Sequence, residues 1–242
     1  MKKNYSQLVP KILNKQHRLR IAAQIISVLQ AYLGETQKLS CLDVGCSNGV
    51  ITNHLAKYFN MLTGIDVDSM AIKDAKSSFK TKNLSFFEMS GEKMSFKDNT
   101  FDVVICNQTY EFVDNQNDLV SEIFRVLKPG GICFLGARNK LTFFESQLGI
   151  PLLHFLPTKA SSLIASLFGK IYYPAKYLTL DGLKKLFKEF IIYDMTIPIL
   201  KNPKKYNYIS LMKYHLFIRF LPVELIYILL PNYIWILEKP QN

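Results

Sequence analysis

Short apolar runs alternate with helix-patterned segments between residues 38 and 137, and this alternation constrains the fold more than any other feature. Each apolar run has the length of a buried strand, and the segments between them repeat apolar residues at helical intervals. Strand, helix and strand repeated at this spacing predict a parallel sheet with helices on both faces. The expected strands are Leu39–Val44, Leu62–Asp66, Leu84–Phe87, Phe101–Cys106 and Ile132–Ala137, and the expected helices are Val50–Tyr58, Ser69–Lys80 (capped by Ser69 or Asp68) and Asp118–Leu127.

The first strand ends in the turn "DVGCSNG", residues 43–49, and a helix follows at once. In sheets of this kind ligands bind beyond the carboxyl ends of the strands, where a glycine turn lets the backbone approach them. A dinucleotide fingerprint would place a glycine where Ser47 stands, and a Walker loop would end in Gly-Lys-Ser/Thr, which is absent here. The turn therefore allows close approach to a ligand but is poorly suited to a pyrophosphate.

Two acidic residues at strand ends narrow the choice of ligand. Asp43 lies two residues before Gly45, and its carboxylate repels phosphate and attracts a cation such as an ammonium group. At an effective dielectric near 20, a charge pair about 4 Å apart interacts by roughly 4 kcal/mol before desolvation. Asp66 follows Gly45 by 21 residues, about the distance at which an acidic residue binds ribose hydroxyls. A ligand with a ribose and an ammonium but no phosphate is S-adenosylmethionine, which we expect as the cofactor.

Four segments in order carry a family resemblance: "LDVGCSNG", "GIDVD", "SFKDNTFDVVICNQTYEFV" and "EIFRVLKPGG". Together they resemble the class I S-adenosylmethionine-dependent methyltransferases, in the branch that includes the ubiquinone and menaquinone methyltransferases. The resemblance runs from about residue 38 to residue 137, with a looser similarity in the last two strands. It implies an α/β fold of Rossmann-like type: a mostly parallel seven-stranded sheet, helices on both faces, an antiparallel last strand and helical cap inserts.

The resemblance also implies which residues hold the cofactor. The first turn would bind its methionine end, Asp66 its ribose and Val67 its adenine. Residues 90–92 would lie along the adenine edge. Relatives commonly carry an aspartate where Ser90 stands. In this chain Ser90, Glu92 or backbone groups would therefore bind the adenine amino group. The implied cofactor-binding residues are Asp43, Gly45, Cys46, Ser47, Gly49, Asp66, Val67, Ser90, Gly91, Glu92, Asn107, Gln108 and Thr109, the last three in the methyl-donor pocket.

Methyl transfer from a sulfonium is an in-line displacement that needs alignment but no acid, because the leaving group departs neutral. A base is needed only for a weakly acidic hydroxyl or a protonated amine. The catalytic candidates follow the fourth strand: Glu111 as a base, Tyr110 as a wall of the acceptor pocket, and Asp114. Relatives often carry a histidine where Phe112 stands, which favours the alternative of a structural role for Glu111. No metal site is expected. The histidines are His17, His54, His154 and His215, and the last two lie in the inserts, where they would face the acceptor. A surface or packing role is the alternative for all of them.

The chain outside the core divides into an N-terminal helix and two inserts. We expect the inserts to cover the acceptor site with apolar walls and a basic rim, or else to extend the hydrophobic core. The predicted organisation is a basic amphipathic helix within 1–37 (residues 8–33), a cofactor-binding core at 38–138 and a cap insert at 139–178. Residues 179–242 would begin with a last helix, Thr179–Phe187, capped by Thr179 or Asp181. Two strands, Phe190–Ile197 and Tyr233–Glu238, would then flank a second cap insert at 198–232.

Positive charge is concentrated in the second half of the chain. Residues 138–242 hold 14 basic and 6 acidic side chains, a net +8, against 16 and 13, a net +3, in residues 1–137. A basic excess attracts nucleic acid or an anionic membrane surface, and a solvated lysine face is the alternative. Because the basic half is also rich in Tyr, Phe, Leu and Ile, we expect an anionic membrane surface and a small-molecule or lipid- or glycan-linked acceptor rather than nucleic acid.

Cysteine placement and the lack of long apolar segments bear on location. The four cysteines lie in or beside apolar runs and form no CxxC pair, which predicts buried thiols in a reducing compartment. No secretory signal follows Lys2 and Lys3, and the uncharged stretch from Leu225 to Leu237 is shorter than the roughly 20 residues of a membrane span. The expected location is the cytoplasm, with peripheral association with the membrane.

These observations together predict an S-adenosylmethionine-dependent methyltransferase that acts on a small or lipid- or glycan-linked acceptor, such as a polyprenyl-linked sugar or a quinone-like lipid. An RNA or protein methyltransferase is the alternative enzyme. A non-catalytic S-adenosylmethionine-binding module is the alternative outside catalysis, and the intact first motif, with Asp43, Gly45, Gly49 and Asp66, disfavours it.

Overall fold

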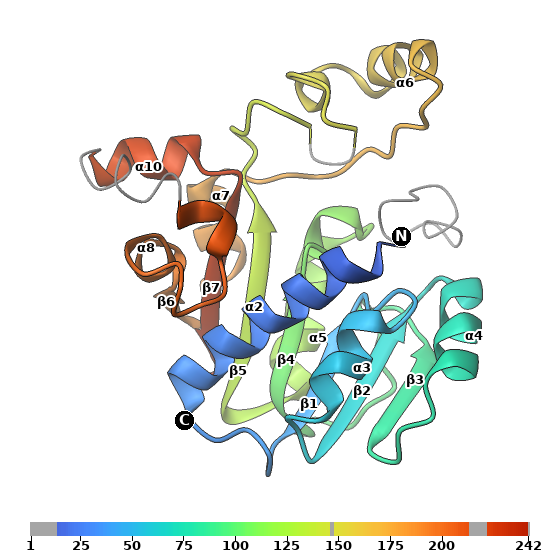
Figure 1. The fold of residues 1–242 in the computed structure, drawn as a ribbon, viewed down its shortest axis with the longest axis vertical. Helices are drawn as coiled ribbons and strands as arrows, with labels where there is room; N and C mark the ends of the chain where they lie inside the picture. Colours follow the sequence, from blue (N-terminus) through green and yellow to red (C-terminus); the bar gives the residue numbers. More distant parts are fainter. Residues whose placement is uncertain (1–13, 146–147, 213–221, 242) are drawn as a thin grey trace.

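The computed structural model of the 242-residue chain describes residues 14–145, 148–212 and 222–241. Seven strands form one sheet in the order β3-β2-β1-β4-β5-β7-β6 (Figure 1). Strands β1 to β5 run parallel, and β7 lies antiparallel to both of its neighbours, β5 and β6. The predicted Rossmann-like fold with an antiparallel last strand is confirmed. The strands are β1 Ser40–Val44, β2 Met61–Asp66, β3 Leu84–Glu88, β4 Phe101–Asn107, β5 Leu127–Arg138, β6 Ile191–Asp194 and β7 Asn232–Glu238.

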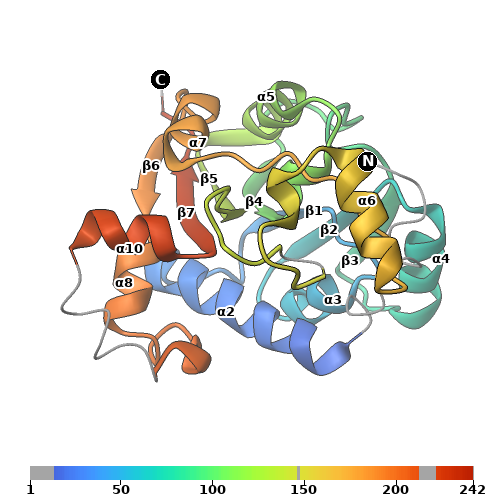
Figure 2. The same cartoon turned by 90° about the horizontal axis from the view of Figure 1, so that it is seen from above.

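Helices cover both faces of the sheet (Figure 2). One face carries α2, α3 and α8 around a core that includes Ile25, Leu55 and Ile199, and the other carries α5 and α7 around Leu119 and Leu183. The central strands are buried on both faces, which explains why they read as continuous apolar runs. The helices flanking the sheet are α2 Lys15–Leu33, α3 Val50–Ala56, α4 Ser69–Ser78, α5 Gln116–Val126, α7 Leu180–Leu186 and α8 Thr196–Lys201.

Helix starts follow the capping side chains. Asp68 rather than Ser69 caps α4, because its carboxylate accepts the N–H of the third helical residue at 3.1 Å. Asn115 caps α5, which therefore begins two residues earlier than predicted. Thr179 caps α7, one of the two predicted caps. The N-terminal helix predicted over residues 8–33 starts later than predicted: α2 begins at Lys15, because Asn14 is its N-cap and accepts the His17 N–H at 3.0 Å. The predicted start at residue 8 lies outside the described residues.

Two predicted strands are wrong in length. The fifth strand, predicted over Ile132–Ala137, is β5 Leu127–Arg138 and so includes Lys128–Gly131, a segment predicted only to end a helix. The alternation over Phe190–Ile197 predicts a single strand, but β6 ends at Asp194 and α8 begins at Thr196. The Asp194 carboxylate accepts the Thr196 N–H at 2.7 Å, the Tyr227 hydroxyl at 2.8 Å and the Trp235 indole N–H at 3.1 Å. Hydrogen bonds between side chain and backbone thus stop the ladder where side-chain alternation alone would continue it.

Residues 139–178, called the arm below, leave the end of β5 and extend away from the sheet (Figure 1). Their described part contains the short helix η3, Leu153–Phe155, and the helix α6, Thr158–Leu167. The arm starts at the end of β5 toward which the strands β1, β2 and β4 also point, so it rises from the carboxyl edge of the parallel sheet.

Asn139 fixes the base of the arm. It is fully buried and forms an isolated β-bridge with Leu178, so the chain leaves and returns at one place. Its side-chain amide donates to three carbonyls at the end of helix α10, Val223–Leu229, and just beyond it. These acceptors are the carbonyls of Tyr227, Ile228 and Leu230, at 3.0, 3.1 and 2.9 Å.

The cysteines are buried and free, as predicted: Cys41, Cys46, Cys106 and Cys133. Burial raises the pKa of each thiol, so all four stay protonated and behave as small apolar side chains. Across the described ranges, every helix is too short or too polar to cross a bilayer.

Candidate active site

The turn between β1 and α3 presents backbone at the carboxyl edge of the sheet. Gly45 and Gly49 have φ values of +80° and +74°, and Ser47 between them has +51°. A Cβ atom at Gly45 would lie 2.4 Å from the hydroxyl oxygen of Thr109, so glycine is needed there for space as well as for conformation. The Gly45 N–H donates to the Ile65 carbonyl at 2.8 Å, which ties the turn to the end of β2.

Asp43 is a buried carboxylate beside this turn. It is 5% exposed and accepts a hydrogen bond from the Thr52 hydroxyl at 2.7 Å. Burial raises the pKa of Asp43 to about 6, while the Thr52 hydrogen bond and the Arg18 guanidinium of α2 act in the opposite direction. A buried carboxylate is stabilised by a cation beside it, so the position fits an ammonium group.

Asp66, at the end of β2, holds the turn in shape. Its two carboxylate oxygens accept the N–H groups of Ser47 and Asp68, at 2.8 and 2.9 Å. Burial raises the pKa of Asp66, and these backbone donors oppose the rise. Asp43 and Asp66 thus come from neighbouring strands and flank the same glycine turn, as the sequence motifs predict.

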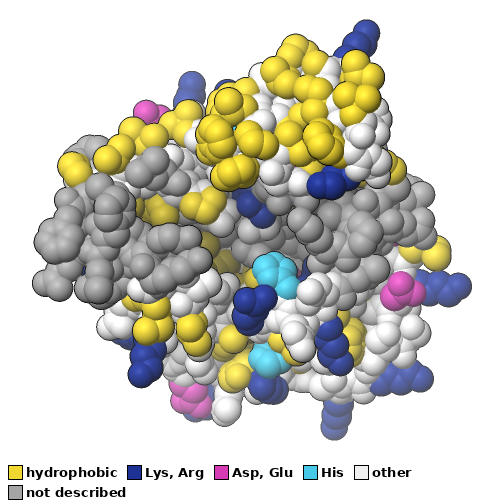
Figure 3. Space-filling model, turned by 45° about the horizontal axis from the view of Figure 1, so that its top comes forward, with side chains coloured by type: hydrophobic (Ala, Val, Ile, Leu, Met, Phe, Trp, Pro, Cys, Tyr) yellow, Lys and Arg dark blue, Asp and Glu magenta, His cyan; other side chains and the backbone are white. Residues whose placement is uncertain are grey.

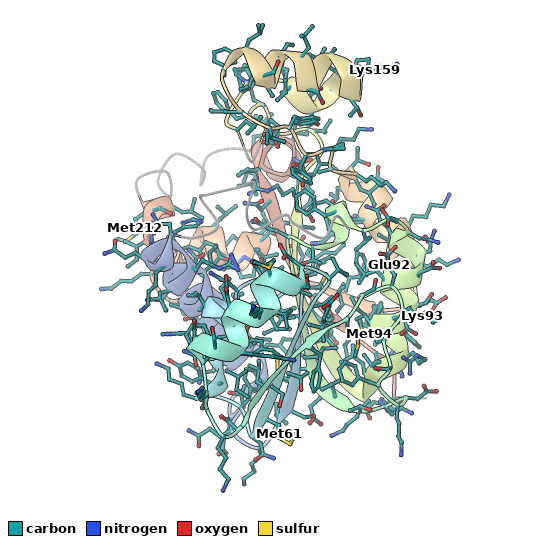
Figure 4. All side chains as sticks on the ribbon, turned by 90° about the vertical axis from the view of Figure 1, so that its right-hand side faces the viewer. Met61, Glu92, Lys93, Met94, Lys159 and Met212 are labelled. Carbon is teal, nitrogen blue, oxygen red and sulfur yellow. The ribbon has the colours of Figure 1, made fainter. Side chains whose placement is uncertain are left out.

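A narrow cleft beside the turn brings together residues from separate sequence segments. Glu92 lies with its neighbours Lys93 and Met94 in the loop between β3 and β4 (Figure 4), and its N–H donates to the Ser90 hydroxyl at 3.2 Å. The Cys46 side chain belongs instead to an apolar cluster under α4. The predicted cofactor residues that line the cleft are Gly45, Asp66, Val67, Ser90, Gly91, Glu92 and Thr109.

The end of β4 separates this cleft from a larger cavity. Thr109 is buried on the cleft side, and its hydroxyl donates to the Val44 carbonyl at 2.9 Å. Asn107 and Gln108 line the larger cavity instead. The side-chain oxygen of Gln108, a residue with a φ of +56°, accepts a hydrogen bond from the Arg138 guanidinium at 3.1 Å. Consecutive residues at the end of β4 therefore line both the cleft and the larger cavity.

The larger cavity has a volume of about 290 Å³ and lies between α2, the sheet and the second insert. A neighbouring hollow of about 480 Å³ exceeds this cavity, which is larger only than the cleft, and shares His17, Ile21, Gln24 and Ser210 with it. The described residues of the second insert line the larger cavity, whereas those of the arm do not. Its apolar walls include Ile25, Phe134, Ile199, Leu211, Leu230 and Ile234, and its polar groups include His17, Asn107, Gln108, Arg138, Thr196 and Asn232.

Tyr110 and Glu111, the catalytic candidates, are buried in the short helix η2, Tyr110–Phe112. The Tyr110 hydroxyl donates to the Arg138 carbonyl at 3.1 Å and accepts the Leu178 N–H at 3.3 Å, so it joins β5 to the arm. Both carboxylate oxygens of Glu111 are buried without a hydrogen-bond partner among the described residues. Burial raises the pKa of Glu111 to about 7, and the Arg138 charge opposes this. Neither side chain lines the larger cavity.

Helix α2 contributes two side chains that the sequence motifs did not single out for the site. His17 is an exposed residue that lines part of the larger cavity, and its pKa is lowered by partial burial of the imidazole and by nearby arginines. Arg18 acts electrostatically on Asp43. The one signal for them was the basic, amphipathic pattern of the segment. Of the other candidates, Asp114 is exposed, His54 lies beside Tyr58 in the region of α3, His154 belongs to the arm and His215 lies outside the described residues.

Comparison with known proteins places the core of the chain in a family. The methyltransferase domain family matches residues 42–135. Malonyl-[acyl-carrier protein] O-methyltransferase of Bacillus cereus is 27% identical over 128 residues, which are 52% of this chain and 47% of the relative. Ubiquinone biosynthesis O-methyltransferase of Albidiferax ferrireducens is 33% identical over 103 residues, 41% of each chain. The chain thus spans about half the length, or less, of these curated relatives.

The fold agrees with this match. Phosphoethanolamine N-methyltransferase 2 of Haemonchus contortus, solved in complex with S-adenosyl-L-methionine, aligns with a TM-score of 0.57 at 17% identity, over 90% of this chain and 52% of that chain. The structure therefore has the class I fold of S-adenosylmethionine-dependent methyltransferases. Residues 42–135 of this chain are a methyltransferase domain, as the sequence motifs predicted.

Proposed function

We propose that this protein transfers a methyl group from S-adenosylmethionine to an apolar acceptor, either a small molecule or one linked to a lipid or glycan. The supporting observation is the larger cavity, whose apolar walls meet polar groups at Asn107 and Gln108. These two residues stand at and just beyond the end of β4, which pairs with β1, the strand that contains Asp43. Its volume of about 290 Å³ is near the lower end of ligand pockets, roughly 300–1,000 Å³. That size suits a ring system or a short prenyl segment.

The turn and the cleft beside it would hold the cofactor, which supplies a methyl group on a positively charged sulfur. Asp43 would pair with the ammonium group, since a pKa of about 6 leaves the carboxylate ionised at neutral pH. Arg18, which already acts on Asp43, would bind the methionine carboxylate. Asp66 would bind the ribose, and the cleft at Val67 and Ser90 would take the adenine. The fit is supported by Gly45, where any side chain would collide with Thr109.

The contribution of the chain to the reaction would be alignment and proton removal. The acceptor nucleophile forms a bond to the methyl carbon as the carbon–sulfur bond breaks, and the electron pair goes to sulfur. A hydroxyl acceptor must also lose its proton. His17 would take it, because its lowered pKa keeps the imidazole neutral at pH 7 and it lines the cavity. Arg138, which also lines the cavity, would stabilise the developing negative charge on the acceptor oxygen. Glu111 stays a second candidate base.

A tritiated-methyl screen tests this proposal. The protein is incubated with labelled S-adenosylmethionine and separate lipid, glycan, RNA and protein fractions of cells, and the label in each is counted. We expect label in the lipid or glycan fraction with the natural chain and none with Asp43→Ala. Label confined to RNA or protein would contradict the proposed acceptor. Cofactor binding with no transfer to any fraction would instead support the non-catalytic module.

A further inference from the structure

The arm exposes a large apolar surface where it projects from the body of the molecule. Figure 3 shows hydrophobic side chains gathered over the projecting part. Monomeric soluble proteins rarely expose apolar patches larger than a few hundred Å², and larger ones mark interaction sites. The most exposed members include Phe143, Phe144, Phe155, Leu163, Leu167 and Phe168, with exposed fractions between 47% and 78%.

Helix α6 shows that this exposure is not incidental. Its buried residues are Ser161 and Ala165, which are small, while Leu163 and Leu167 are 65% and 78% exposed. Phe168, directly after the helix, is 64% exposed. A helix on the surface of a globular protein normally turns its apolar side chains to the core. Here the leucines face away from the protein, so α6 is suited to apolar surroundings outside it.

The charges of the arm have one sign at its surface. Lys140, Lys159, Lys170 and Lys176 are exposed, and Lys159 lies at the far end of the arm (Figure 4). The acidic side chain in the described part of the arm is Glu145, which is 1% exposed and accepts the N–H of Leu148 at 2.7 Å. The surface of the arm therefore combines exposed leucine and phenylalanine with lysine and no exposed acid among its described residues. This combination binds the interface of anionic membranes.

We propose that the arm docks on an anionic lipid bilayer, with Leu163, Leu167 and Phe168 in the interface and the lysines against the lipid headgroups. The arm rises from the carboxyl edge of the sheet, the edge that also carries the candidate active site (Figures 1 and 2). A bilayer in contact with the arm would therefore lie on the side of the molecule that carries the candidate active site. The docking itself does not depend on methyl transfer.

Flotation of the full chain with vesicles tests the docking. Vesicles of phosphatidylcholine alone are compared with vesicles containing phosphatidylglycerol, at low and high salt. We expect flotation only with phosphatidylglycerol and a decrease with salt. The variant Leu163→Ser/Leu167→Ser/Phe168→Ser should bind at least tenfold more weakly. Lys159→Gln/Lys170→Gln should weaken binding about fivefold for each lysine.

Matched controls remove the same kinds of side chain away from the arm. Met61→Ser/Met70→Ser/Ile191→Ser replaces side chains that are 58%, 44% and 45% exposed, and Met61 lies at the opposite end of the molecule from the arm (Figure 4). A second control, Lys73→Gln/Lys93→Gln, removes two exposed lysines outside the arm, in the segment 38–138. Both controls should float like the natural chain.

Two results in flotation would overturn the proposal: no flotation of the natural chain, or equal flotation of the arm and control variants. A third would be that the natural chain dimerises and the arm variant does not, while vesicles bind neither the natural chain nor the variant. Calorimetry with S-adenosylmethionine on every variant shows that the core is intact. It also separates this test from the proposed function, because a protein that floats and binds cofactor but methylates nothing leaves the docking standing.

Discussion

The turn after β1 buries charge, whereas the arm after β5 exposes apolar side chains. Asp43 and Asp66 are 5% and 7% exposed, and the carboxylate of Asp43 accepts one hydrogen bond and that of Asp66 two. In the arm, Leu167 is 78% exposed and Phe168 64%. Both regions lie at the same edge of one sheet, so the difference does not come from the fold as such.

The contrast teaches that each region is adapted to a different environment. A buried carboxylate such as Asp43 is unfavourable until an opposite charge lies beside it, which makes the turn suited to a cationic ligand. An exposed leucine such as Leu167 is unfavourable in water until an apolar phase covers it, which makes the arm suited to an external surface. The vesicle variants described above test the arm side of this comparison. The four variants below test the buried side, the first two at the buried carboxyls of Asp43 and Glu111 and the others at the acceptor cavity.

Asp43→Ala should have the largest effect. Loss of a charge pair worth roughly 4 kcal/mol should weaken binding of S-adenosylmethionine about a thousandfold in calorimetry while the circular dichroism spectrum is unchanged. Asp74→Ala, which removes an exposed carboxylate in α4, is the control and should bind normally. Unchanged affinity in Asp43→Ala would show that the buried charge does not select the ligand.

Glu111→Gln should stabilise the protein at alkaline pH. The folded carboxyl has a pKa raised by burial from 4.5 to about 7, so the unfolded chain ionises first and stability falls as pH rises between these values. The shift corresponds to about 3 kcal/mol. Urea unfolding should show a gain of up to that size at pH 8 and none at pH 4. If the gain is independent of pH, the Glu111 carboxyl does not titrate as its burial implies. Loss of methyl transfer in this variant would favour a catalytic role.

His17→Gln should lower kcat for a hydroxyl acceptor about 100-fold, the lower end of the contribution of a general base. In the natural chain the rate should fall on the acid side, at a pH below the ordinary histidine pKa of 6.5, because burial and neighbouring arginines lower the pKa of His17. The variant should lose this acid limb. His54→Gln is the matched control, and an acid limb that persists in His17→Gln would assign the proton transfer to another group.

Ser210→Trp should have the smallest effect of the four. Ser210 lines both the larger cavity and the neighbouring hollow, so an indole there would occupy space beside both. We expect KM for the acceptor to rise about tenfold with cofactor affinity unchanged. Ser77→Trp, on the exposed side of α4, should change neither quantity. A normal KM in Ser210→Trp would place the acceptor elsewhere.

Much of the core could be predicted from the sequence because its signals are local. The buried strands read as apolar runs, and positive φ values require glycine at Gly45 and Gly49, within a few residues of Asp43. The antiparallel last strand followed from the family resemblance. The helix starts at Asp68 and Asn115 were decided by single capping side chains, at positions where neighbouring polar residues competed for the same role.

The acceptor side could not be predicted in the same way because its contacts join distant segments. His17 reaches the cavity only because α2 packs across the sheet beside β5 and α8. Because both inserts are rich in apolar residues, the sequence predicted that both would form walls of one acceptor site. Composition alone does not tell whether an apolar side chain faces inward or outward. In the structure, Leu230 and Leu211 line the cavity, while Leu163 of the arm points outward.

Asn139 gives the arm a mechanical link to the cavity. The side-chain amide of Asn139 donates to the Leu230 carbonyl at 2.9 Å, and its backbone N–H donates to the Pro231 carbonyl at 3.0 Å. Both Leu230 and Pro231 line the cavity. A displacement of the base of the arm must therefore carry this wall with it or break several buried hydrogen bonds. If lipid contact shifts the base of the arm, lipid contact and acceptor binding become thermodynamically reciprocal, and each changes the affinity for the other by the same factor.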